Sequence, residues 1–155
     1  MDSKHLNIIL AEDDADDRLF FETALKDFPY ETSITFVNNG QHLMELLHDI
    51  TELPHVLVVD FNMPRKNGFE CLQEIKSNRD LKNIPVIIYS TSYQIQIVNL
   101  LFQNGAHFFI QKTGDFFAFK KAIQYAITYT QKNAAQPKRK DFMLIARNDT
   151  VRSKD

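Results

Sequence analysis

The feature that most constrains the fold is a run of four apolar residues, 56–59, that leads directly into the carboxylate of Asp60. Three of the four are valines, and a short continuous apolar run is typical of a strand buried on both faces of a parallel sheet. Asp60 would then lie at the C-terminal end of that strand, where open α/β sheets bind their ligands. From this stretch alone, Asp60 is either a ligand-binding residue or a residue that caps a turn.

Short apolar runs alternate five times along the chain with stretches in which apolar residues recur every three or four positions. The predicted strands are residues 7–11, 33–37, 56–59, 84–89 and 107–111. The predicted helices start near residues 15, 43, 69, 95 and 115. This alternation predicts an α/β fold in which helices cover both faces of a parallel sheet. Right-handed crossovers would then place all five strand C-termini at one edge.

Length and composition indicate one ordinary globular domain rather than two. The net charge of −2 indicates neither a nucleic acid nor an anionic membrane as a partner. The single cysteine, Cys71, permits no internal disulfide, which fits a reducing compartment. The N-terminus lacks the pattern of a signal peptide, and no apolar run approaches the roughly 20 residues that span a bilayer. We therefore expect a cytoplasmic protein.

Polar side chains follow four of the predicted strands. They are Glu12, Asp13 and Asp14 after the first, Asp60 and Asn62 after the third, Ser90 and Thr91 after the fourth, and Lys112 after the fifth. Crowded carboxylates repel one another unless a cation joins them, and Mg²⁺ prefers oxygen ligands. A hydroxyl and a lysine can bind the remaining oxygens of a phosphoryl group. The edge therefore predicts a site for Mg²⁺ and a phosphoryl group.

Each of these residues also has a plainer interpretation. Asp14 can start the first helix, where a negative side chain complements the helix dipole. Ser90 can be an ordinary turn hydroxyl, and Lys112 an ordinary surface lysine. Their joint occurrence on separate strand ends favours a site.

The segments ILAEDD, VLVVDFNMP, IPVIIYSTS and FIQK, in this order, resemble the receiver domain of two-component response regulators. The resemblance covers residues 4–131. Asp60 precedes Ser90 by 30 positions and Lys112 by 52, spacings typical of chemotaxis-type single-domain receivers. The resemblance implies a flavodoxin-like (βα)5 three-layer sandwich with a parallel five-stranded sheet of order 2-1-3-4-5.

Carried over by position, the resemblance makes Asp60 the phosphoacceptor. It assigns Glu12 and Asp13 to a Mg²⁺ pocket, with Asp13 the more direct ligand, and gives the ion the backbone carbonyl of Asn62.

The resemblance also assigns the remaining site residues. Ser90 becomes the hydroxyl that turns toward the phosphoryl group, Lys112 its charged partner, and Phe109 the aromatic switch residue. The family usually has Lys-Pro with a cis bond after the fifth strand, whereas Thr113 stands here. Because a non-proline cis bond costs about 3 kcal/mol, a trans bond is favoured. Lysine followed by a small hydroxyl residue is similar to the stand-alone receivers associated with bacterial phytochromes and other hybrid sensor kinases.

The resemblance implies a response regulator of a phosphorelay, which is not an enzyme in the usual sense. Its partners would be a sensor histidine kinase or phosphotransfer protein and a downstream protein target, without DNA or membrane contact. Residues 132–155 are too few for an effector domain, and residues 138–140 form only a small basic cluster. The apolar residues 142–145 in this tail predict that it docks on its own domain or on a second copy, making a homodimer; otherwise the tail is flexible.

Three alternatives remain at this stage. A pseudo-receiver would be an interaction module that works without phosphorylation. A haloacid-dehalogenase-type phosphatase also uses an aspartate nucleophile and Mg²⁺, but its nucleophile follows the first strand, whereas Asp60 follows the third. A flavodoxin shares the fold, but the acidic residues after the first strand would repel a flavin phosphate.

Overall fold

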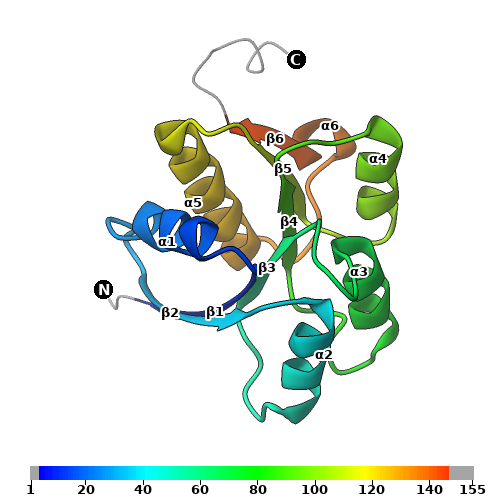
Figure 1. The fold of residues 1–155 in the computed structure, drawn as a ribbon. Coiled ribbons are helices and arrows are strands. Elements are labelled where there is room, and N and C mark those ends of the chain that lie inside the picture. Colours follow the sequence, from blue (N-terminus) through cyan, green and yellow to red (C-terminus); the bar gives the residue numbers. More distant parts are fainter. Residues whose placement is uncertain (1–3, 147–155) are drawn as a thin grey trace.

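The structure is a computed structural model that describes residues 4–146 (Figure 1). Its strands are β1 (His5–Ala11), β2 (Glu31–Val37), β3 (Val56–Asp60), β4 (Val86–Ser90), β5 (Phe108–Lys112) and β6 (Met143–Ala146). Its helices are α1 (Ala15–Ala24), α2 (Gly40–Asp49), α3 (Gly68–Ser77), α4 (Ile95–Gln103), α5 (Phe116–Lys132) and α6 (Arg139–Phe142). Within the described residues, no helix has the length and apolar character needed to cross a membrane.

The strands form one parallel sheet of order β2-β1-β3-β4-β5-β6. Helices α1 and α5 cover one face, and α2, α3 and α4 cover the other (Figure 1). The predicted flavodoxin-like order 2-1-3-4-5 is confirmed, but the prediction of five strands is incomplete, because β6 lies beside β5. A short apolar segment after α5 adds this strand to an edge that would otherwise be open.

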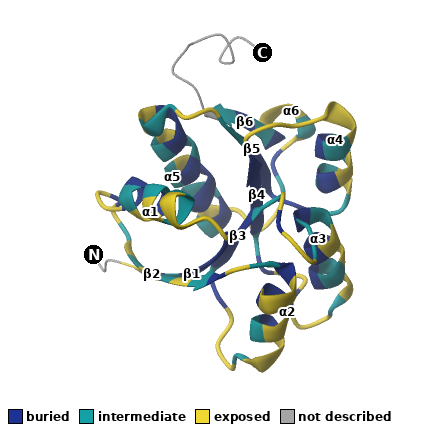
Figure 2. Ribbon diagram, in the orientation of Figure 1, coloured by how far each residue is buried: buried dark blue, intermediate teal, exposed yellow. Residues whose placement is uncertain are grey.

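The central strands are buried on both faces, which explains their unbroken apolar sequence (Figure 2). In β3, Leu57 and Val59 pack with α2, α3 and α4, whereas Val56 and Val58 pack with α1 and α5. Strand β2 lies at an edge and alternates between exposed and half-buried positions up to Val37. The period-two geometry of a strand therefore divides the core into two layers.

Side chains at the helix starts fix where the helices begin. The carboxylate of Asp14 accepts a hydrogen bond from the Asp17 backbone N–H, so Asp14 caps α1, the plainer of its two interpretations. Asn67 and Glu70 form a reciprocal capping box at α3. After α4, Gly105 has φ +97°, a left-handed conformation that glycine adopts without a steric penalty.

The segment after α5 packs on the chain's own domain. The Gln136 amide donates to the carbonyl oxygens of Phe102 and Ala106 at 2.8 and 2.6 Å. Phe142 is fully buried, with its ring centroid 5.2 Å from that of Phe102. Residues 147–155, the rest of the predicted tail, lie outside the described residues, and the homodimer stays a prediction.

Candidate functional site

The polar residues that follow the strands meet at one edge of the sheet, as the topology requires. Asp60 ends β3 and is paired in register with Tyr89 on β4. Glu12 directly follows β1, and Ser90 ends β4. Lys112 ends β5. The five parallel strands β1 to β5 thus place their carboxyl ends together, where this fold class binds ligands.

Three carboxylates form the centre of the site. Glu12, Asp13 and Asp60 each offer one oxygen, and these oxygens lie within 4.8 Å of one another. Burial, followed by the charge of Glu12, raises the pKa of Asp60 to about 7. Burial also raises the pKa of Glu12, whose exposed fraction is 1%. Negative charge is thus concentrated where a cation would be stabilised.

Both oxygens of Glu12 are held by hydrogen bonds. The hydroxyl of Tyr89 donates to Oε1, and the backbone N–H of Asp14 donates to Oε2 at 3.1 Å. Burial and then the Glu12 charge raise the pKa of Tyr89 well above its usual value. Tyr89 was not among the site residues predicted from the sequence, where its only signal was a phenol within an otherwise apolar strand.

Asn62 and Ser90 are linked beside Asp60. The Asn62 side-chain amide donates to Ser90 Oγ at 3.1 Å, and its backbone N–H donates to Asp60 Oδ1 at 3.2 Å. Ser90 also accepts from the backbone N–H of Ser92 at 3.3 Å. The role expected for Asn62 from the resemblance was to offer its backbone carbonyl to the ion, whereas in the structure its side chain holds the hydroxyl of Ser90 next to Asp60.

Lys112 approaches the site from the face of α1 and α5. Its ammonium group forms an ion pair with Asp17 and lies 4.7 Å from the centroid of the Phe20 ring. Only 10% of the Lys112 side chain is exposed. Asp17, the present partner of this lysine, was also missed from the sequence.

The Lys112–Thr113 bond is trans, since the described part of the chain contains no cis peptide bond.

Phe109 lies on the opposite face of β5 from Lys112. Its exposed fraction is 1%, and its ring centroid lies 6.3 Å from that of Tyr93. Its register partner on β6 is Met143. The candidate switch residue is therefore enclosed between the end of β4 and the segment that follows α5.

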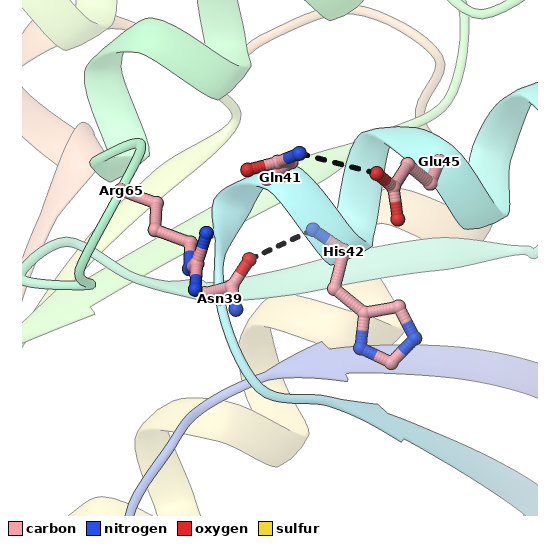
Figure 3. Close-up of a pocket in the computed structure, with 5 residues that line it drawn as sticks. All are labelled: Asn39, Gln41, His42, Glu45 and Arg65. Atoms are coloured by element: carbon pink, nitrogen blue, oxygen red, sulfur yellow. Dashed lines mark hydrogen bonds between the residues drawn. The ribbon is translucent and has the colours of Figure 1, made fainter.

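A separate polar hollow of about 170 Å³ lies between the start of α2 and the loop after β3 (Figure 3). Its lining residues are Asn39, Gln41, His42, Glu45 and Arg65. Asn39 caps α2 by accepting from the His42 backbone N–H at 2.8 Å, and the Gln41 amide donates to Glu45 at 3.2 Å. The side chains of Asn39, Gln41 and Glu45 are thus engaged in contacts local to the first turns of α2.

Comparison with known proteins identifies the family of this chain. Residues 8–124 match the response regulator receiver domain. The chain belongs to this family. Receiver domains are phosphorylated by histidine kinases and interact with downstream targets, and they bind divalent metal ions.

The relatives of this receiver domain include response regulators of a cyanobacterial phytochrome and of bacteriophytochromes. It is 29% identical over 122 residues to the response regulator Rcp1 of Synechocystis, covering 76% of this chain and 83% of Rcp1. The structure of the Mn²⁺-bound form of Rcp1 has a TM-score of 0.74 and 26% identity, covering 85% of this chain and 99% of that one. The phosphorylated cyanobacterial phytochrome response regulator RcpA has a TM-score of 0.70 and 28% identity, covering 78% and 90%.

Proposed function

We propose that this receiver domain acts as a response regulator that accepts a phosphoryl group on Asp60 in a Mg²⁺-dependent reaction. The observation that carries the proposal is the environment of Asp60. Its carboxylate ends a buried strand within 4.8 Å of oxygens of Glu12 and Asp13, and its pKa is raised to about 7. A carboxylate crowded by like charges is typical of a functional site rather than of a turn cap.

The residues present fit Mg²⁺. Glu12, Asp13 and Asp60, with the backbone carbonyl of Asn62, would supply the oxygen ligands that this ion prefers. When bound, Mg²⁺ would offset the negative charge on the transferring phosphoryl oxygens. The Mn²⁺-bound form of the relative Rcp1 supports a divalent ion at this site.

In the proposed reaction, a carboxylate oxygen of Asp60 attacks the phosphorus atom of a phosphohistidine on the donor protein. The new P–O bond forms as the P–N bond breaks, and the electron pair returns to the imidazole nitrogen, which takes up a proton. Lys112 leaves Asp17 to pair with the phosphoryl oxygens, and Ser90 donates its hydroxyl hydrogen to one of them. The chain thus assists its own phosphorylation and dephosphorylation, and we propose no other enzymatic activity.

The donor is a sensor histidine kinase or a phosphotransfer protein in the cytoplasm, and the output is contact with a protein target. The phosphoryl group selects between two arrangements of the protein-binding face through Ser90 and Phe109. A full reversal of populations requires about 5.5 kcal/mol of differential binding. Contacts to Lys112 and Ser90, both absent before phosphorylation, would supply that difference.

The test is intact-protein mass spectrometry after incubation with acetyl phosphate and Mg²⁺, with wild type and Asp60→Asn side by side. We expect one phosphoryl adduct on the wild type, which does not form when EDTA is present from the start and is absent from the variant. An adduct on both proteins would show that the acceptor is another residue.

A pseudo-receiver is the second candidate function. The absence of an adduct in the wild type, together with measured Mg²⁺ binding, would favour it. The phosphatase alternative receives no support from the structure, because Asp60 follows β3 rather than the first strand.

A further inference from the structure

We propose that Tyr89 is a positioning residue of the metal pocket, whose hydroxyl holds the Glu12 carboxylate toward Asp13 and Asp60. This inference rests on the proposed function only in that the pocket binds Mg²⁺. Tyr89 would act through Glu12, without itself touching the ion or the phosphoryl group.

The placement of Tyr89 brings its hydroxyl to the metal pocket. Its exposed fraction is 3%, and its backbone lies opposite Asp60 in the sheet register. Tyr89 packs in the layer covered by α1 and α5, whereas Ile88 packs on the face of α4, to which Ser90 also projects by alternation. From there its hydroxyl donates to Oε1 of Glu12.

Hydrogen bonds to both oxygens limit the rotation of the Glu12 carboxylate. Glutamate has three rotatable side-chain bonds, so a buried carboxylate held at one oxygen can still turn. Here Tyr89 holds Oε1 from β4, and the Asp14 backbone N–H holds Oε2 from the start of α1. A carboxylate has about four acceptor positions, so two remain free for a cation or its bound water.

The ring of Tyr89 is itself held in place by packing in the core. Its ring makes an edge-to-face contact with Phe119 of α5, at 6.2 Å between centroids, within the layer of the core covered by α1 and α5. A phenylalanine at position 89 would fill the same volume but would leave Oε1 of a buried carboxylate without its donor. The hydroxyl of Tyr89, not the ring, is therefore the part that the pocket requires.

The competing interpretation is that Tyr89 is a core residue whose hydroxyl uses the nearest acceptor and has no effect on the metal pocket. The two interpretations predict different Mg²⁺ affinities when Tyr89 and Glu12 are substituted together. A positioning role requires that the effect of removing the hydroxyl depends on the Glu12 carboxylate, whereas a packing role does not.

The experiment is isothermal titration of Mg²⁺ into the full chain, as wild type, Tyr89→Phe, Glu12→Gln and the double variant. Residues that orient a metal ligand typically contribute 10- to 100-fold to affinity, so we expect Tyr89→Phe to weaken Mg²⁺ binding about tenfold. In the Glu12→Gln background the same substitution should have no further effect. Tyr129→Phe is the matched control, because Tyr129 packs in the same layer of the core but lies at the far end of α5.

Wild-type affinity in Tyr89→Phe, or an equal loss in both backgrounds, would overturn the inference. Thermal unfolding of each variant checks the fold. The acetyl phosphate assay separates this outcome from that of the proposed function. A Mg²⁺ affinity that depends on Tyr89 in a chain that forms no adduct would retain the inference and reject the phosphoacceptor.

Discussion

Replacing Phe142 with alanine tests whether the segment after α5 is part of the cooperative fold. The Phe142 side chain is fully buried, pairs with the Phe102 ring at 5.2 Å, and has the Arg139 guanidinium 5.9 Å from its ring centroid. Truncating a buried phenylalanine typically costs about 3–5 kcal/mol, because transfer and cavity terms add. Undocking of the segment would limit this cost, so we expect about 3 kcal/mol.

The assay is equilibrium unfolding in urea. With an m-value of about 2 kcal/mol/M, a loss of 3 kcal/mol lowers the midpoint by about 1.5 M. Phe117→Ala is the control, since Phe117 is 71% exposed and its truncation should cost less than about 0.5 kcal/mol. Equal midpoints for the two variants would refute the reasoning.

The same unfolding assay, repeated at several protein concentrations, tests whether the segment docks on its own domain or on a second copy. If the segment docks on its own domain, the wild-type midpoint is independent of protein concentration. If it docks on a second copy in solution, the midpoint rises with concentration, because dimerisation stabilises by mass action. The second result would support the predicted homodimer.

Three further predictions concern charge. Asp17→Asn removes the present partner of Lys112, so acetyl phosphate should produce several-fold more adduct per unit time by mass spectrometry, and an unchanged or slower rate would contradict this. Burial raises the pKa of Asp60 from 3.8 to about 7, so the folded state binds more protons than the unfolded state between those values. Without metal, stability should therefore fall as pH rises through this window. The full pKa shift corresponds to about 4 kcal/mol, which partial exposure of Asp60 to solvent roughly halves, so Asp60→Asn should be about 2 kcal/mol more stable than wild type at pH 8 in urea unfolding; equal stabilities would refute this. Burial lowers the pKa of His107 below its ordinary 6.5, so the unfolded state binds more protons there. Stability should fall as pH decreases below about 6.5, and His107→Gln should flatten that slope in the same assay; an unchanged slope would reject the assignment.

The sequence pattern was sufficient to predict where five of the six strands lie, and the resemblance to receiver domains gave the order in which those five pair. Continuous apolar runs such as residues 56–59 are set by burial on two faces, and right-handed crossovers then leave few topologies. The same logic placed Asp60 and Ser90 at one edge, because both end such a run. These predictions depend only on backbone position.

Side-chain partners were not predictable in the same way. Tyr89 occurs in an apolar run, where an aromatic residue indicates a core position, and its reach to Glu12 depends on the packing of β4 against β1 through β3. Lys112 and Asp17 are 95 positions apart, and their pairing requires α1 and α5 to lie side by side. Strand β6 was missed because a four-residue apolar segment carries no periodicity, and the open edge of β5 decides its conformation.

The residues of the proposed switch lie on two different faces of the sheet. Residues alternate along β4 and β5, so Tyr89 and Lys112 lie on the face of α1 and α5, while Ser90 and Phe109 lie on the face of α4. In the proposed switch, the first pair would position Glu12 and bind the phosphoryl oxygens, and the second pair would transmit the change to the protein-binding face. Strand β6 lies beside β5 in the sheet, and its Met143 is the register partner of Phe109. Because Phe109 is 1% exposed, a rotation of its ring changes the packing of that segment. If the proposed switch operates through Phe109, we predict that the surface contacted by a target protein in the phosphorylated form includes residues 139–146, so a target-binding study should retain them.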